Sequence, residues 1–241
     1  MPDLMANPPV HLRPNAPVAE RALLPGDPGR ALRLAQHLLE APMQVLNTNR
    51  GLWGYTGTAS DGAPLTIQST GMGGPSAAIV LEELIDLGAR RIVRVGTCGG
   101  LSDDLELGAL VVADAVLPED GTSRALGADG TLRPDAALNE ALRGAAPEAA
   151  SGLVVSSDLF YDPDPDRAPA WARAGALAVE MEAATLLAIA GRRGVAAAVV
   201  LAVSDIVASR TRIEQDALER AEAELGRAGL DALAPLNGRA A

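Results

Sequence analysis

The chain has 241 residues, a formal net charge of −11 and 48% hydrophobic residues. That length favours one large α/β domain, and the hydrophobic fraction is ample for a sizeable core. The acidic balance, without any basic run, argues against nucleic acid or an anionic membrane as a partner. Cys98 is the single cysteine, which excludes an internal disulfide and a cysteine-based metal cluster and fits a reducing compartment.

The N-terminal residues 1–10 are polar and proline-rich and lack the apolar segment of a signal peptide. No stretch of the chain approaches 18 uncharged apolar residues, the length that a membrane span requires. We therefore expect a cytoplasmic protein in which 1–10 form a flexible extension.

Strand and helix patterns alternate through the first half of the chain. The expected elements are a strand at 21–24, a helix with Ala31, Leu34, Ala35 and Leu38 on its apolar face, a hairpin of 51–58 and 65–69, a helix at 77–87, a strand through Arg94, a strand at 110–117 and a loop-rich stretch at 119–134. Pro75 suits the first turn of the helix at 77–87.

The second half continues the alternation. The expected elements are strands at 152–156, 176–179 and 195–203 and helices at 168–174, 183–193 and 214–233. Alternating strands and helices predict a largely parallel sheet with helices on both faces. No repeat of fixed period and no long linker divides the chain, so 1–241 is expected to form a single domain.

Arg94 is a charged residue inside an apolar strand that runs into a glycine-rich turn at 96–100. Burying a guanidinium is costly unless it meets an anion. Ligands of open α/β sheets collect beyond the carboxyl ends of the strands. Thr97 adds a hydroxyl, and the glycines let backbone N–H groups approach a ligand closely. This strand end favours a phosphate site, the alternative being an arginine that reaches out to a surface carboxylate.

Four further segments place chemistry at expected strand ends. They are 25–30, 71–76, 179–184 and the pair Ser204-Asp205. Each has a plain structural alternative: a tight glycine turn, carboxylates favoured by the start of a helix, or a helix N-cap. Singly, none of these segments identifies a function.

Together these segments form an ordered set of motifs. They are Pro25-Gly26-Asp27-Pro28-x-Arg30, Asn49-Arg50-Gly51, Gly71-Met72-Gly73-x-Pro75-Ser76, Arg94-Val95-Gly96-Thr97-Cys98-Gly99, Ser157-Asp158-Leu159-Phe160-Tyr161, Glu180-Met181-Glu182-Ala183-Ala184 and Ser204-Asp205. The set resembles the nucleoside phosphorylase superfamily, of the uridine phosphorylase and hexameric purine nucleoside phosphorylase type, over nearly the whole chain from His11. The resemblance implies a three-layer α/β/α sandwich with a mixed, largely parallel, twisted central sheet.

The resemblance also implies an activity and an assembly. The activity is cleavage of the N-glycosidic bond of a nucleoside by phosphate, which gives free base and ribose 1-phosphate. Phosphate is the co-substrate, and neither a metal nor another cofactor is expected. The assembly is a homo-oligomer, a hexamer built as a trimer of dimers, in which active sites are shared between subunits.

Site residues carry over to individual positions of this sequence. The resemblance implies phosphate binding by Gly26, Arg30, Arg94 and Thr97, with Arg50 reaching the phosphate of a neighbouring subunit. It implies a nucleoside site of Met72, Phe160, Val179, Glu180, Met181, Glu182 and Ser204, with His11 again crossing from a neighbour. Asp205 would give a proton to the base, and Arg220, or else Arg210 or Arg212, would pair with that acid.

The chemistry of the reaction agrees with these roles. Glycosidic cleavage passes through a cation-like sugar, so a phosphate dianion held by arginines serves as nucleophile and counter-charge. A carboxylate suits the two adjacent hydroxyls of ribose. A purine leaves poorly as an anion, so an acid beside its ring lowers the barrier.

Two departures from the uridine enzymes favour a purine substrate. Acids occupy 162–166, where those enzymes carry a glutamine and an arginine for uracil, and Ser204-Asp205 has no counterpart in them. The glycine loop at 71–76 and Thr97 look more like the uridine enzymes, which leaves uridine phosphorylase as an alternative. Methylthioadenosine or adenosylhomocysteine nucleosidase and a silent nucleoside-binding protein are further alternatives. The choice between 6-amino and 6-oxo purines stays open.

Overall fold

The computed structural model describes residues 9–234, so the expected flexible extension lies outside it except for its last two residues. Its strands form one sheet in the order β10-β9-β6-β7-β8-β5-β1-β4-β3-β2. Their bounds are β1 Arg21–Leu24, β2 Gln44–Asn47, β3 Gly54–Thr58, β4 Pro64–Gln68, β5 Arg91–Gly100, β6 Leu110–Glu119, β7 Ala150–Ser157, β8 Ala176–Glu180, β9 Ala196–Ile206 and β10 Thr211–Arg212.

Five of these strands close into a ring, because β5 pairs with both β8 and β9. The β5–β9 pairing is parallel along the length of β5, whereas β8 meets only the Gly99-Gly100 end of β5 and runs antiparallel to it. The register of β5 and β9 shifts between Cys98 and Gly99, which lets this end bend toward β8. The sheet is mixed, as expected, whereas the segment 96–100, which was expected to be a glycine-rich turn, is the last part of β5.

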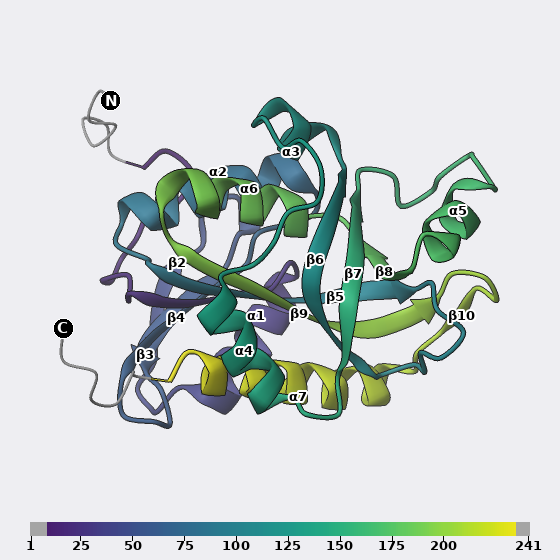
Figure 1. Cartoon of the computed structure of the whole chain (residues 1–241). Coiled ribbons are helices and arrows are strands. Elements are labelled where there is room, and N and C mark those ends of the chain that lie inside the picture. The colour runs from purple at the N-terminus through teal and green to yellow at the C-terminus, as the bar shows by residue number, and fades with distance from the viewer. Residues whose placement is uncertain (1–8, 235–241) are drawn as a thin grey trace.

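Helices cover both faces of the sheet, which gives the three expected layers; α2 and α6 lie above the sheet and α7 below it in Figure 1. Their bounds are α1 Pro28–Leu38, α2 Gly74–Asp86, α3 Gly121–Ala125, α4 Ala136–Ala145, α5 Arg167–Arg173, α6 Ala183–Arg193 and α7 Gln215–Ala232. Successive residues of β5 point to opposite faces of the sheet. Val93 and Val95 pack with α1, α4 and α7, whereas Ile92 packs with α2 and α6. Among the described helices, none is both long and apolar enough for a membrane crossing.

Several elements differ from the sequence expectation. The expectation assigned nothing to α4, β2, β10 or the 3-10 turn Asn49–Gly51, and it treated α3 as loop. α4 had a usable signal, since Asp135 accepts a hydrogen bond from the Leu138 N–H (2.9 Å) as its N-cap. α1 begins three residues earlier than its apolar face suggested, with Pro28 in its first turn.

Arg21 on β1 is a buried arginine that joins three segments of the chain. It donates to both carboxylate oxygens of Asp61 (2.6 and 2.9 Å), to two carbonyls of the β3–β4 turn and to the Leu233 carbonyl after α7. Arg91 donates to the Leu233 carbonyl as well (3.0 Å). Two cations therefore satisfy the C-terminal end of α7, where the helix dipole is negative.

The ion pair of Arg21 and Asp61 predicts a pH dependence of stability. Hydrogen bonds from Arg21 hold the pKa of Asp61 below its ordinary value. The stabilisation is therefore complete above the unfolded value of about 3.9 and is lost as the pH falls through the lowered pKa. Asp61→Asn should reduce the free energy of unfolding by about 1–2 kcal/mol at pH 6, because it removes a hydrogen-bonded charge.

Denaturant titrations at pH 6 and pH 3 measure this difference. The gap between wild type and Asp61→Asn should shrink at pH 3, while the exposed control Asp129→Asn should match wild type at both values. A gap of equal size at both pH values would contradict the assignment.

Candidate active site

Arg94 is buried on β5, with 4% of its side chain exposed. Its Nε donates to Glu180 Oε2 (2.9 Å), and its Nη2 donates to Glu182 Oε2. Gly96 makes this geometry possible, because a Cβ there would lie 2.8 Å from Arg94 Nη2 and 3.0 Å from Leu201 Cδ2. The arginine therefore does not reach a surface carboxylate, and two carboxylates hold it inside the sheet end.

Glu180 ends β8 and is held by the start of α6. Its carboxylate accepts from the N–H groups of Glu182 (2.9 Å) and Ala183 (2.9 Å) and from the hydroxyl of Ser156. Ser156 Oγ in turn accepts from the Ala184 N–H (2.8 Å). The first turn of a helix favours a negative charge, so the side chain of Glu180 is fixed in the orientation that meets Arg94.

Glu182 connects β5 with the glycine loop before α2. Besides the bond from Arg94, its Oε1 accepts from the Gly73 N–H (2.6 Å). Burial raises the pKa of the Glu182 carboxyl, against the pull of Arg94 and of the Gly73 N–H toward the ionised form. Each carboxylate oxygen accepts one bond from the protein and retains a lone pair for a ligand hydroxyl.

The turn from β1 into α1 brings a second buried arginine to the same end of the sheet. Arg30 is 6% exposed, its Nη1 lies 3.5 Å from the Val95 carbonyl on β5, and its charge acts on Glu182. Gly26 in this turn accepts from the Gly71 N–H (3.0 Å), which joins the two glycine loops. Arg30, Arg94 and both carboxylates thus lie at one sheet end, with Gly26 and Thr97 on elements that reach it.

Asp205 lies near the end of β9, paired in register with Gly99 of β5. Ser204 Oγ lies 2.9 Å from Asp205 Oδ1 and 3.2 Å from the Cys98 carbonyl. The chain then turns back as β10, which places Arg212 directly opposite Asp205. The expected partner Arg220 lies exposed on α7 instead. Of the arginines weighed from the sequence, Arg212 is therefore the one that the hairpin places beside this acid.

The expected nucleoside-binding residues, here called the rim, are partly apolar, and several are exposed. Met72 is 86% exposed and Phe160 is 58% exposed, while Val179 and Met181 are partly buried beside Glu180. The Arg212 guanidinium lies 5.8 Å from the centre of the Phe160 ring, within the range of a cation–π contact. An aromatic side chain, a cation and the carboxylate of Asp205 thus follow one another along this rim.

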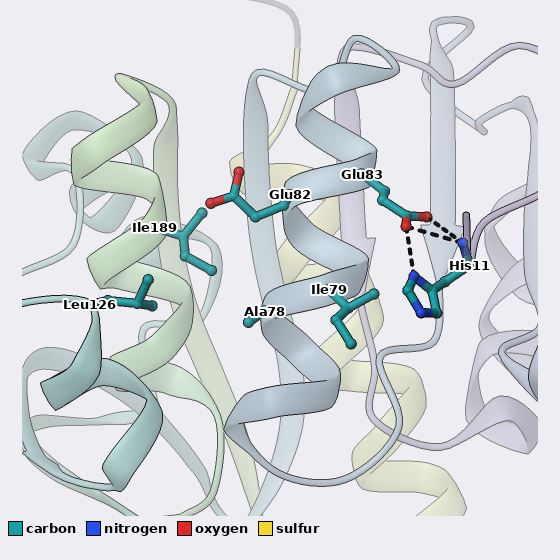
Figure 2. A pocket seen from close by; sticks show the side chains of 7 residues that line it. All are labelled: His11, Ala78, Ile79, Glu82, Glu83, Leu126 and Ile189. Atoms are coloured by element: carbon teal, nitrogen blue, oxygen red, sulfur yellow. Dashed lines mark hydrogen bonds and ion pairs between the residues drawn. The ribbon is translucent and has the colours of Figure 1, made fainter. Parts of the chain in front are cut away.

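His11 and Arg50 lie apart from this cluster. Figure 2 shows the His11 ring directed at Glu83 on α2, with Nδ1 2.8 Å from Glu83 Oε1, beside a shallow hollow of about 300 Å³. Asn49 donates to the His11 carbonyl (2.8 Å), and next to it Arg50 is exposed with φ 59°. Within residues 9–234, no hydrogen bond or ion pair joins His11 or Arg50 to Arg30 and Arg94 or to the carboxylates of Glu180 and Glu182.

The family is decided by comparison with known proteins. A family model described as "Phosphorylase superfamily" matches residues 20–234. The chain belongs to the phosphorylase superfamily. Within residues 9–234, no three His, Cys, Asp or Glu side chains gather closely enough to hold a metal ion. Buried guanidiniums and backbone N–H groups are groups that bind an anion.

Curated relatives narrow the comparison. The chain is 39% identical over 209 residues to a purine nucleoside phosphorylase DeoD-type of Clostridium perfringens, covering 82% of this chain and 87% of the relative. It is 37% identical to a purine nucleoside phosphorylase DeoD-type of Caldanaerobacter subterraneus subsp. tengcongensis, with 78% and 83% covered. A guanosine phosphorylase of Halorubrum lacusprofundi is 39% identical, with 83% of both chains covered.

Sequence reasoning missed three polar residues around this site. Ser156 donates to Glu180, and Glu222 accepts hydrogen bonds from Arg30 and Arg33. Ser156 is a buried strand hydroxyl next to a recognised motif. Glu222 had a clearer signal, because it falls among Leu218, Ala221 and Leu225 on the apolar face expected for the last helix. A carboxylate at such a position needs a buried partner.

Gly96→Ala tests whether the Arg94 geometry governs anion binding. Carboxylates lock Arg94, so it cannot yield to an added Cβ without losing its position, and a shift of about 1 Å can cost on the order of 100-fold. Calorimetric titration with inorganic phosphate should show at least tenfold weaker binding in a variant that stays folded. Gly144→Ala on α4 is the matched control, since a Cβ there meets nothing within 4 Å. Equal phosphate affinity in both variants would contradict the assignment.

Proposed function

We propose that the protein is a purine nucleoside phosphorylase, which transfers the ribosyl group of a purine nucleoside to inorganic phosphate. The observation that carries the proposal is a pair of buried arginines that act on the carboxylate of Glu182: Arg94 is hydrogen-bonded to it, and the charge of Arg30 lowers its pKa against the effect of burial. A phosphate dianion fits the guanidiniums, and the adjacent ribose hydroxyls fit the carboxylate. The similar curated proteins are named for the same reaction class.

The proposed reaction is a single displacement at the anomeric carbon. A phosphate oxygen, held by Arg30 and Arg94, forms the new bond to C1′ as the bond from C1′ to the base nitrogen breaks. The electron pair of that bond passes to the purine, which takes a proton from Asp205. Arg212 is placed to stabilise the carboxylate that remains. No metal and no cofactor other than the phosphate substrate has a role.

A purine fits the rim better than uracil does. Acidic residues occupy 162–166, and Asp162 is already paired with Arg167 (2.9 Å). This stretch therefore has no amide side chain and no unpaired guanidinium to form hydrogen bonds with the two carbonyls of uracil. In the proposed reaction, Asp205 gives its proton to the ring nitrogen of a purine. Uridine phosphorylase and a hydrolytic nucleosidase remain the competing activities.

One assay separates these activities. The purified protein should release hypoxanthine from inosine with phosphate present and not without it, and ribose 1-phosphate should form in equal amount. Adenosine, guanosine and uridine are assayed beside it, since the preference for the 6-substituent is open. Release of base without phosphate would indicate a nucleosidase, and a preference for uridine would overturn the purine assignment.

Asp205→Asn tests the acid directly. Asparagine keeps the shape but has no proton to give, so kcat on adenosine should fall by roughly 10²–10⁴ with the melting temperature nearly unchanged. The loss should be smaller on 6-oxopurines, where the amide still bonds N7 and O6. It should also shrink for 7-methylguanosine, whose base leaves without protonation. Small and equal losses on all these substrates would return Asp205 to a structural role.

We further propose that the enzyme is a homo-oligomer, a hexamer built from dimers, in which His11 and Arg50 complete the site of a neighbouring subunit. The segments of the two residues are linked by the hydrogen bond from Asn49 to the His11 carbonyl, and within residues 9–234 no hydrogen bond or ion pair joins His11 or Arg50 to Arg30 or Arg94. The exposed positive-φ backbone of Arg50 presents its side chain outward. We also propose that the reaction takes place in the cytoplasm, since the single cysteine fits a reducing compartment.

Subunit mixing tests the shared site. When inactive His11→Ala and Arg94→Ala proteins exchange subunits at equal amounts, about a quarter of the sites should become native in a two-fold pair. Mixing Arg94→Ala with Glu182→Ala is the matched control, because both changes affect residues from the same chain. No recovery in the first mixture after demonstrated exchange would contradict shared sites.

A further inference from the structure

Glu222 is a buried carboxylate on α7, with 2% of the residue exposed. Its Oε1 accepts from Arg30 Nε (2.7 Å), and its Oε2 accepts from Arg33 Nε (3.1 Å) and Nη2 (2.6 Å). Both arginines are on α1, so the carboxylate also joins α7 to α1. A buried carboxylate is kept only where charged donors satisfy it, and here two guanidiniums do so.

The hydrogen bond that Arg30 donates to Glu222 determines which edge of the Arg30 guanidinium is available to a ligand. Arg30 uses Nε for Glu222, and its Nη1 makes only a long 3.5 Å contact with the Val95 carbonyl. The outer edge of the guanidinium is thereby directed away from α7. Arg94 is arranged in the same way, since Glu180 takes its Nε. The two anion-binding arginines are each oriented by a carboxylate at the same atom.

Arg33 balances the charge of this arrangement. Arg94 faces two carboxylates, Glu180 and Glu182, so those three groups sum to −1. Arg30 and Glu222 together have no net charge, so without a further cation they would not offset the −1 of the Arg94 group. Arg33 brings the sum of Arg30, Arg33 and Glu222 to +1. Its Nη2 also lies 3.8 Å from Asp27, but the side chain of Asp27 is 51% exposed, so solvent screens that carboxylate. Without Arg33, an incoming dianion would meet a site with excess negative charge.

We propose that Glu222 and Arg33 are positioning residues of the phosphate site: Glu222 orients Arg30, and Arg33 neutralises Glu222 so that the charge of Arg30 is available to phosphate. This inference rests on the proposed function. It differs from a purely structural link between α1 and α7, because such a link would affect stability and leave the balance between the two substrates unchanged.

Glu222→Gln and its matched control Glu224→Gln, an exposed residue of the same helix, test the proposal. The Gln variant leaves Arg30 and Arg33 to repel each other, and Arg30 loses its ionised acceptor. The phosphate Kd from calorimetry and the phosphate KM should rise about tenfold or more, with the inosine KM within about twofold. Unchanged or tighter phosphate binding, or an equal rise in both KM values, would overturn the proposal.

Arg33→Gln and Arg33→Lys provide a second test if Glu222→Gln fails to fold. The Arg33 side chain is one-third exposed, so its replacement disturbs the core less. Arg33→Gln should raise the phosphate KM several-fold, and Arg33→Lys should recover part of the loss because it restores the charge. Equal values for the two variants would refute the charge-balancing role.

Two results distinguish failure of this inference from failure of the proposed function. If the wild-type protein releases hypoxanthine without any dependence on phosphate, the proposed function fails and the positioning role fails with it. If the wild-type reaction depends on phosphate and the variants retain their phosphate KM, only the positioning role is overturned.

Discussion

The burial of Arg94 between Glu180 and Glu182 is the interaction on which the rest of the site depends. A guanidinium inside a parallel strand is costly, and this one is tolerated because two carboxylates meet it at fixed edges. Those carboxylates are in turn held by the first turn of α6 and by the Gly73 N–H. One charge thus brings β5, β8, α6 and the α2 loop to a common point. Ligand recognition and local folding use the same contacts, so the site has little freedom to rearrange.

Closure of the strand ring explains why these groups can converge. β8 pairs with β5 only at Gly99 and Gly100, and this pairing brings Glu180 to Arg94. In an open sheet, the twist between neighbouring strands would carry the ends of β5 and β8 apart. The turns after β1 and β4 add Arg30 and Gly73 from the other side. The arrangement brings Arg30, Arg94 and the carboxylates of Glu180 and Glu182 to one end of the sheet, in a chain whose net charge is strongly negative.

The sequence predicted most of the layers but not their closure. Strands such as 195–203 and the helix at 183–193 have strong periodic patterns. Of the residues expected at strand ends, Glu180 ends β8 and Asp205 lies one residue before the end of β9, whereas Arg94 lies inside β5 and Arg30 lies in the first turn of α1. The antiparallel pairing of β8 with Gly99-Gly100 is a contact between distant segments, and no local pattern reports it. The family resemblance favoured Arg220 as the partner of Asp205, with Arg210 or Arg212 as alternatives, and the β9–β10 hairpin pairs Arg212 with Asp205. Two local patterns do report structure: the N-cap Asp135 marks the start of α4, and the position of Glu222 on the apolar face of α7 marks a buried carboxylate.

The central claim is that phosphate, held beside Glu182 by Arg30 and Arg94, attacks the sugar. Inosine incubated with phosphate fully labelled with oxygen-18 tests it most directly, with the products followed by phosphorus NMR and mass spectrometry. The account predicts ribose 1-phosphate that keeps every labelled oxygen, because the new C1′–O bond comes from phosphate and no P–O bond breaks. Free ribose with no labelled sugar phosphate, or a sugar phosphate lacking one label, would contradict it.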